Sequence, residues 1–334
     1  MIPRPRHRST TSTIPKAPPV NSQPIAVEIK NLVKRFGDFV AVDNVSLNVQ
    51  RGEIFGFLGS NGAGKTTTIR MLCGLLTPTS GSTRVGGFDL ATQAEQIKQT
   101  IGYMSQKFSL YDDLSVSENI DFFSGVYSVP QTLRRERKEY VLKMAGLENR
   151  GDTMTGLLPT GWKQRLALGC AILHQPPILF LDEPTSGVDP IARRTFWDLI
   201  YQLSAKGHTI FVTTHYMDEA EYCHRLALMH RGRLIGLGAA GELKAALVSH
   251  TLMHLESTDV LESLRALEEC AEVVEAAVFG SGLHLMVRDA AAAERAVRAA
   301  LAERSIKVKR LAVIEHSMED VFVAMIEQEE RKAS

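Results

Sequence analysis

The feature that most constrains this chain is the stretch GSNGAGKT at residues 59–66. It matches the pattern GxxxxGK followed by Ser or Thr, which binds phosphate when a strand precedes it and a helix follows it. The preceding EIFGFL is of β type, and the following residues place apolar side chains at helical spacing, at Ile69, Leu72, Leu75 and Leu76. In a chain of 334 residues, a chance match arises on the order of one time in a hundred. The pattern therefore predicts a strand, a phosphate-binding loop and a helix rather than a simple glycine turn.

Each loop residue suits an anionic ligand for a physical reason. The glycines let the backbone curl until successive N–H groups face one side, and the helix that follows directs its positive end there. Lys65 would supply a positive charge to the β and γ phosphates, and the Thr66 hydroxyl would bind Mg²⁺. We expect ATP to contact the loop at Gly59, Ser60, Asn61, Gly62, Ala63, Gly64, Lys65, Thr66 and Thr67.

Two adjacent carboxylates end the apolar run ILFL at residues 178–181. Ionised groups at the end of a buried strand are costly unless a cation or a proton-transfer task awaits them. Asp182 is therefore predicted to hold Mg²⁺ through water, and Glu183 to act as the general base for an attacking water. Asp182 as the cap of a following turn is the alternative, and the nearby phosphate loop disfavours it.

Composition excludes several classes of protein. Lys plus Arg (38) equal Asp plus Glu (38), so no overall field attracts nucleic acid, and we expect no such partner. The four cysteines form no CxxC pair, which argues for core packing in a reducing compartment. The apolar runs are shorter than the roughly 18 residues of a membrane span, and no signal-type segment is present. These features predict a soluble cytoplasmic chain.

Strand and helix patterns suggest an α/β core followed by a smaller module. PILFLDE and HTIFVTTH are of β type and flank the helical PIARRTFWDLIYQL, which implies a parallel sheet with a right-handed crossover. Beyond residue 238 the order β, α, β, β, α, β and a closing helix suggests a ferredoxin-like α+β module.

The same patterns divide the chain into three parts. Residues 1–25 form a basic, Pro-rich segment that we expect to be disordered. We predict a nucleotide-binding domain at 26–238, with a helical subdomain at about 107–165, and an accessory domain at 239–334.

Residues 27–245 resemble the ATP-binding cassette (ABC) ATPases, because further motifs follow the phosphate loop in that family's order. YMSQ, which ends at Gln106, is similar to the Q-loop; SGVD, which ends at Asp189, is similar to the D-loop; and His215 resembles the switch histidine. The resemblance implies a P-loop NTPase fold, with a RecA-like parallel sheet core and antiparallel β and helical subdomains.

The resemblance also implies roles for these residues. Gln106 would sense Mg²⁺ and the attacking water, and His215 would contact the γ-phosphate. Asp189 would lie near nucleotide, while Phe36 falls where the family places an aromatic ring under adenine, with Val42 beside it.

LPTGWKQR at residues 158–165 occupies the place of the family's signature motif, usually LSGGQ. Pro159 replaces the serine that donates to the γ-phosphate of the opposite subunit, and Trp162 replaces the glutamine. The contact would then pass to the Gly161 N–H, the helix dipole and Thr160. This form is similar to the carboxyl-terminal cassette of YbhF-type multidrug efflux ATPases, and SMEDVFVAMI at 317–326 resembles exporter cassettes of the daunorubicin-resistance kind.

A single cassette holds half of two ATP sites, so the resemblance implies a head-to-tail dimer, most simply a homodimer. It implies an ATPase that drives export through a separate integral membrane permease, with the chain on the cytoplasmic face of the inner (plasma) membrane. Aromatic residues after Gln106 would form either a groove for that permease or the core of the helical subdomain. Two other functions stay open: a non-transport ATPase acting on ribosomes or DNA, and a hydrolysis-deficient regulatory cassette, motivated by Pro159 and Trp162.

Overall fold

The computed structural model describes residues 24–106, 110–245 and 251–333, and the chain divides into two compact units, 1–234 and 235–334. The predicted disordered segment at 1–25 lies almost entirely outside the described residues. The division falls within strand β10 (Arg233–Gly238), close to the predicted boundary after residue 238. In the described ranges, no helix has the length and apolar character needed to cross a lipid bilayer.

The first unit begins with an antiparallel sheet of order β2-β1-β4-β5. Its strands are β1 (Ile25–Phe36), β2 (Phe39–Gln50), β4 (Ser80–Val85) and β5 (Phe88–Asp89). Side chains alternate between the two faces of a strand, so one face of β1 and β2 is apolar and buried, including Val27, Ile29 and Val45.

A second sheet of six strands, in the order β10-β9-β3-β8-β7-β6, forms the centre of this unit. Its strands besides β10 are β3 (Ile54–Gly59), β6 (Ile101–Met104), β7 (Ile178–Asp182), β8 (Thr209–Thr214) and β9 (Arg225–His230). The pairs β6–β7, β7–β8, β8–β3 and β3–β9 are parallel. Every residue of β3, β7 and β8 is buried, as expected for parallel strands covered on both faces. The predicted strand, helix and strand at 178–214 are confirmed, with α6 (Pro190–Ala205) as the connection.

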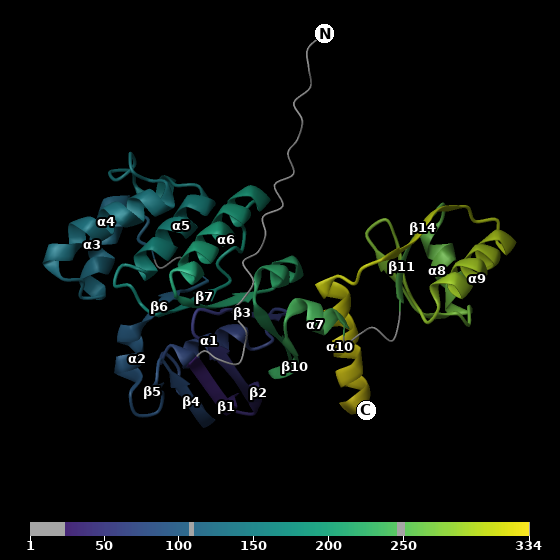
Figure 1. Cartoon of the computed structure of the whole chain (residues 1–334), viewed down its shortest axis with the longest axis horizontal. Coiled ribbons are helices and arrows are strands. Elements are labelled where there is room, and N and C mark those ends of the chain that lie inside the picture. Colours follow the sequence, from purple (N-terminus) through teal and green to yellow (C-terminus); the bar gives the residue numbers. More distant parts are fainter. Residues whose placement is uncertain (1–23, 107–109, 246–250, 334) are drawn as a thin grey trace, which may run out of the picture. The chain divides into compact units, whose positions relative to one another are not determined.

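Helices cover the parallel sheet on one face, and the antiparallel sheet with α1 (Lys65–Leu72) covers the other (Figure 1). Phe57, Phe180 and Phe211 pack toward β1, β2 and α1, whereas Leu181 and Val212 pack against Trp197 of α6. The remaining helices of this unit are α2 (Ala94–Thr100), α3 (Val116–Val126), α4 (Gln131–Ala145) and α5 (Thr160–Ala171), with the 3-10 turns Thr155–Leu157 and Met217–Tyr222. The predicted α/β fold with a parallel core is confirmed.

The helix after the phosphate loop is shorter than the apolar spacing suggests. Four apolar residues through Leu76 have helical spacing, but α1 ends at Leu72. Gly74 adopts φ +69°, a left-handed conformation that stops a helix. Leu75 consequently lies outside the helix and is exposed.

The second unit contains the predicted order of strands and helices. After α7 (Ala240–Ala245) come β11 (Thr251–Ser257), α8 (Val260–Glu268), β12 (Val273–Phe279), β13 (Gly282–Val287), α9 (Ala290–Glu303), β14 (Val308–Ile314) and α10 (Met318–Ala333). The strands form one sheet of order β12-β13-β11-β14, antiparallel at each junction. The assignment of this unit to the ferredoxin-like family stays a prediction.

Candidate functional site

Parallel strands end at one edge of the central sheet and bring the predicted residues together. β3 ends at Gly59, where the phosphate loop begins, and β7 ends at Asp182. β8 lies between them and ends one residue before His215, while β6, on the other side of β7, ends two residues before Gln106. The carboxyl ends of parallel strands are the usual place for a ligand in open α/β sheets.

The phosphate loop needs glycine for both conformation and space. Gly62 and Gly64 adopt φ +79° and +105°, in the left-handed region that favours glycine. A Cβ on Gly64 would collide with the carbonyl oxygen of Ala41, and one on Gly59 with that of Met229. The loop is thus clamped between β2 and β9, and these close approaches fix its curl.

Lys65 is the first residue of α1 and is only 3% exposed. Its Nζ donates to the carbonyl oxygens of Gly59, at 2.8 Å, and Ser60, at 3.1 Å. The same Nζ lies 3.5 Å from Glu183 Oε1. The Lys65 ammonium group therefore lies between backbone carbonyl oxygens of the phosphate loop and the carboxylate of Glu183.

Asp182 presents one satisfied and one unsatisfied oxygen. Its Oδ1 accepts hydrogen bonds from the hydroxyls of Thr66, at 3.0 Å, and Thr213, at 2.7 Å. Its Oδ2 is buried and has no hydrogen-bond partner among the described residues. A buried carboxylate oxygen of this kind is costly by itself and suits a hard cation such as Mg²⁺ or its bound water. Asp182 and Thr66 together fit the predicted metal site.

Glu183 stands at the centre of the cluster. Its Oε2 accepts from Gln106 Nε2 at 2.9 Å and lies 3.2 Å from His215 Nδ1. Its backbone has φ +48°, a strained conformation for a residue with a side chain. The structure thus brings Lys65, Gln106 and His215 around one carboxylate that the sequence assigns as the general base.

Burial disfavours the charged forms of Lys65 and Asp182 in the site. Burial lowers the pKa of Lys65, and the neighbouring Glu183 opposes that change. Burial also raises the pKa of Asp182, while hydrogen bonds from Thr213 and Thr66 lower it in part. An ammonium and a carboxylate that both lack solvation gain most from a ligand that carries an anion for one and a cation for the other. A magnesium nucleotide has both charges.

Thr213 is a site residue that the sequence reasoning missed. It is fully buried on β8, directly opposite Asp182 in the register. Its hydroxyl donates to Asp182 Oδ1 at 2.7 Å and accepts the backbone N–H of Glu183 at 2.9 Å, so one side chain holds both acidic residues. The signal in the sequence is the pair of threonines that interrupts the apolar run before His215.

We predict that Thr213→Val reduces steady-state ATP hydrolysis about 10- to 100-fold, the usual loss when a group that orients a metal ligand is removed. Valine has the same shape but its side chain neither donates to Asp182 nor accepts from Glu183, whose N–H keeps only the backbone carbonyl of residue 213 as acceptor. Thr213→Ser restores the hydroxyl and should recover most of the rate. Titration of Mg²⁺ in the same assay should show a raised requirement for the valine variant alone. A valine variant that hydrolyses ATP as fast as the wild type would show that Thr213 does not position the acidic pair.

The signature motif begins α5 and packs against the start of α6. Pro159 and Thr160, at the beginning of α5, are exposed. A Cβ on Gly161 would stand 2.7 Å from Ala192 Cβ. Trp162, the most unusual residue of the motif, has the Arg150 guanidinium 4.1 Å from its ring and that of Arg165 at 5.8 Å. Its ring is therefore engaged within its own subdomain.

Three further predicted residues occupy distinct environments. Phe36 is 49% exposed, and Lys34 Nζ lies 5.0 Å from its ring centre. Val42 is fully buried in the core beside the phosphate loop. Asp189 is exposed and caps α6, because its carboxylate accepts the N–H groups of Ile191 and Ala192. Contacts of these three with nucleotide stay predictions.

Comparison with protein families gives two matches. The family model described as "ABC transporter" matches residues 42–186. A second model, described as "AAA domain, putative AbiEii toxin, Type IV TA system", matches residues 158–217. Both matches overlap the site.

Curated relatives cover the chain to different extents. The "Probable multidrug ABC transporter ATP-binding protein YbhF" of Escherichia coli (strain K12) is 53% identical over 219 residues, which are 66% of this chain and 38% of that protein. The "Nod factor export ATP-binding protein I" of Ralstonia nicotianae is 34% identical, over 95% of this chain and 98% of that protein. The "Linearmycin resistance ATP-binding protein LnrL" of Bacillus subtilis is 33% identical, over 89% of this chain and 97% of that protein.

Solved structures of similar architecture cover about two thirds of this chain. The structure of cbiO1 from Clostridium perfringens, described as part of the ABC transporter complex cbiONQ, has a TM-score of 0.61 with 29% identity, over 66% of this chain and 91% of that one. The "dimeric structure of a post-hydrolysis state of the ATP-binding cassette MJ0796 bound to ADP and Pi" has a TM-score of 0.59 with 28% identity, over 64% of this chain and 98% of that one.

Proposed function

We propose that this chain, which belongs to the family of ABC transporter ATP-binding proteins, hydrolyses ATP to drive export through a separate membrane subunit. The observation that carries the proposal is the position of Glu183. Its carboxylate lies within 3.5 Å of Lys65 Nζ, 3.2 Å of His215 Nδ1 and 2.9 Å of Gln106 Nε2. A general base needs a fixed orientation, and the contacts with these three neighbours support that role for Glu183.

The residues of the site divide the work of hydrolysis. The phosphate loop and Lys65 bind the β and γ phosphates, and Thr66 with Asp182 holds Mg²⁺. The chemistry supplied by Mg²⁺ held at Thr66 and Asp182 would be neutralisation of the charge that develops on the phosphate oxygens. Glu183 accepts a proton from the attacking water, while Gln106 and His215 fix the direction of its carboxylate. Phe36 offers an exposed ring to the adenine.

Two chains would complete each ATP site. The exposed start of α5 contains Pro159, Thr160 and the Gly161 N–H. Among the described residues, no hydrogen bond joins it to the phosphate loop of the same chain. We propose that it contacts nucleotide on a second copy, with Asp189 beside the junction. Proline has no N–H and no hydroxyl, so the helix N-terminus and Thr160 would provide the contact.

Exposed aromatic residues of the helical subdomain would bind the permease. Tyr111 is 45% and Phe122 is 43% exposed, and their rings meet edge to face at 4.8 Å. Phe123 and Tyr127 instead pack on the core of the subdomain. The aromatic residues thus divide between core and surface, and the surface pair is the proposed contact. The chain would then work on the cytoplasmic face of the inner membrane.

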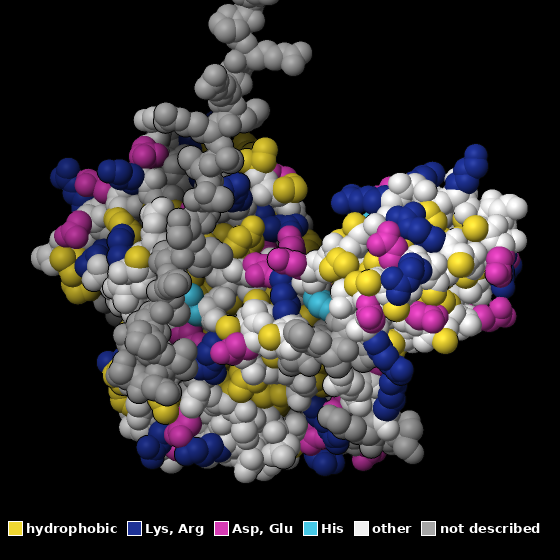
Figure 2. Space-filling model, turned by 45° about the vertical axis from the view of Figure 1, so that its right-hand side comes forward, with side chains coloured by type: hydrophobic (Ala, Val, Ile, Leu, Met, Phe, Trp, Pro, Cys, Tyr) yellow, Lys and Arg dark blue, Asp and Glu magenta, His cyan; other side chains and the backbone are white. Residues whose placement is uncertain are grey.

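Export is favoured over a ribosome- or DNA-linked function. The relatives described above are named for multidrug transport, Nod factor export and linearmycin resistance. On the face shown in Figure 2, blue cationic and magenta anionic side chains are interspersed, whereas a nucleic-acid site needs a concentration of positive charge.

The test is co-purification of the full chain from detergent-solubilised membranes of its native cells, in the presence of ATP. We expect a protein with several membrane spans to be recovered, and the double substitution Tyr111→Ala and Phe122→Ala to reduce its recovery. Arg135→Ala and Glu139→Ala, at an exposed ion pair on α4, are the matched control. Recovery of ribosomes or DNA in place of a membrane protein would contradict export.

A further inference from the structure

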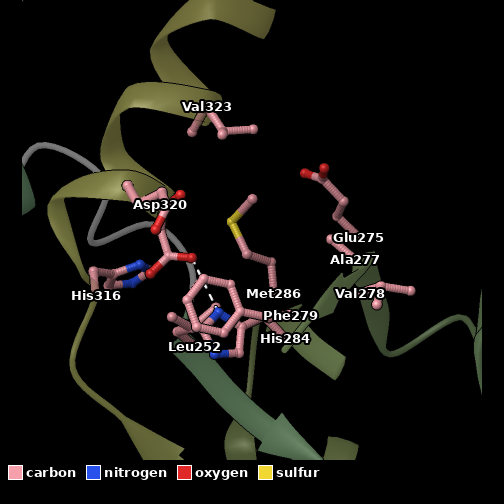
Figure 3. A pocket seen from close by; sticks show the side chains of 12 residues that line it. Leu252, Glu275, Ala277, Val278, Phe279, His284, Met286, His316, Asp320 and Val323 are labelled. Atoms are coloured by element: carbon pink, nitrogen blue, oxygen red, sulfur yellow. Dashed lines mark hydrogen bonds and ion pairs between the residues drawn. The ribbon is translucent and has the colours of Figure 1, made fainter. Parts of the chain in front are cut away.

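The second unit contains a pocket that the proposed function does not use. It lies between the sheet and α10, and its volume is about 230 Å³. Figure 3 shows Leu252, Met286 and Phe279 on the strands and Val323 on α10 around the same space. All of its lining residues belong to residues 235–334, so the pocket is complete within one unit.

The pocket exists because the two faces of the sheet are covered unequally. Helices α8 and α9 cover one face, where Leu255, Leu285 and Val297 form a closed core. On the other face α10 covers only part of the sheet. Val278, Phe279 and Val323 remain 53%, 40% and 49% exposed around the opening. Large apolar side chains that converge on one exposed cavity indicate a ligand site.

The polar side chains that line the pocket are three acids and two histidines, His284 and His316. Glu275, Glu319 and Asp320 line it, and no lysine or arginine is among the described lining residues. Asp320 is already engaged, because it accepts from Ser317 Oγ at 2.6 Å and from His284 Nδ1 at 3.0 Å. Burial raises the pKa of Asp320, but these hydrogen bonds outweigh burial and hold it below its usual value. Asp320 is therefore a negatively charged side chain, held in place in the first turn of α10.

Glu275 lies beside a second carboxylate, that of Glu327 on α10. In Figure 3 its carboxylate stands beside Met286, on the side of the space toward Val323. Burial raises its pKa, and so does the neighbouring carboxylate of Glu327; Arg331 opposes the rise only in part. Two carboxylates close together in a partly buried place repel each other unless a cation or a shared proton lies near.

We propose that this pocket binds a small amphiphilic cation, with its apolar body against Met286, Phe279 and Val323 and its positive group beside Glu275. The apolar walls supply burial, and Glu275 supplies the charge. Arg331, whose guanidinium lies 3.8 Å from Glu327 Oε2, offsets the repulsion between Glu275 and Glu327 in part, and a bound cation would offset it further. This inference does not depend on ATP hydrolysis.

The test measures binding of phenyltrimethylammonium to the full chain by equilibrium dialysis. This probe has ten non-hydrogen atoms, which suits a small pocket, and we expect a dissociation constant below about 1 mM. tert-Butylbenzene has the same shape without the charge and should bind at least about tenfold more weakly. Benzoate, which reverses the charge, should not bind.

Variants locate the site. Glu275→Gln should weaken binding of the cation about tenfold, and Ala277→Leu, at an exposed lining position of β12, should block it by filling the space. Glu303→Gln and Ala302→Leu, both exposed on α9, are the matched controls and should bind as the wild type does. Thermal melting without probe verifies that all four variants are folded.

Each other outcome overturns the proposal. If no saturable binding is found at probe concentrations up to about tenfold above the expected dissociation constant, the pocket does not bind such a cation. Equal binding by the wild type and the folded Ala277→Leu variant would place the probe elsewhere. Equal binding of tert-butylbenzene would make the pocket a purely apolar one and remove the role of Glu275.

Discussion

Replacement of Glu183 by glutamine is expected to lower steady-state ATP hydrolysis about 10²- to 10⁴-fold, the usual contribution of a general base. Glutamine keeps the size and most contacts of the side chain but cannot accept a proton from water. Because Lys65 and the phosphate loop are unchanged, ATP should still bind. The measurement is phosphate release at saturating Mg²⁺ and ATP, together with nucleotide affinity by equilibrium dialysis.

The same variant should also show that ATP joins two chains. With hydrolysis blocked, the ATP-bound state persists, so Glu183→Gln should elute as a dimer in ATP and as a monomer in ADP. Glu148→Gln, at an exposed position, is the control and should behave as the wild type does. A wild-type protein with no ATPase activity to lose would identify a regulatory cassette, and an unchanged rate in Glu183→Gln would move the base to another residue.

The core of the site was predictable because its chemistry is local in the sequence. Eight consecutive residues form the phosphate loop, and Asp182 and Glu183 are adjacent at the end of an apolar run. Parallel strands then bring their carboxyl ends to one edge, so the order of strands and helices was enough to place the loop beside the acidic pair.

What the sequence did not reveal depends on tertiary register. Thr213 is opposite Asp182 only because β7 and β8 pair in one particular alignment. The left-handed backbone of Glu183 depends on its N–H reaching Thr213. The end of α1 was missed for a different reason, since apolar spacing continued past Gly74 while the backbone did not.

The pocket of the second unit was also beyond sequence reasoning. Glu275 on β12 and Glu327 on α10 are distant in the chain, and nothing in either local pattern indicates that they meet. The pattern SMEDVFVAMI predicted a closing helix but not which face of the sheet it would cover. The order of strands and helices follows from local periodicity, so it could be predicted from the sequence more readily than the packing between them.

Replacement of Lys65 by alanine is expected to weaken ATP binding at least about 100-fold, because it removes the buried positive charge beneath the phosphate loop. The lysine also donates to the Gly59 and Ser60 carbonyl oxygens. Its loss removes the lysine donor from both carbonyl oxygens, of which that of Ser60 still accepts the Ala63 N–H, and should destabilise the fold by about 1–3 kcal/mol. Equilibrium dialysis with ATP and thermal unfolding in the absence of nucleotide measure the two effects separately.

Comparison with Glu183→Gln separates loss of charge from loss of fold. Glu183→Gln should keep ATP binding and lose hydrolysis, whereas Lys65→Ala should lose both, since hydrolysis needs the bound phosphates. Lys65→Arg keeps the charge but has a planar, larger head that does not fit a site where lysine is 3% exposed, so it should also bind poorly while remaining positively charged. Lys98→Ala, at a surface ion pair, should leave binding unchanged. If folded Lys65→Ala protein bound ATP as tightly as the wild type, the phosphate loop would not be the nucleotide site, and the roles assigned to Asp182 and Glu183 would lose their basis.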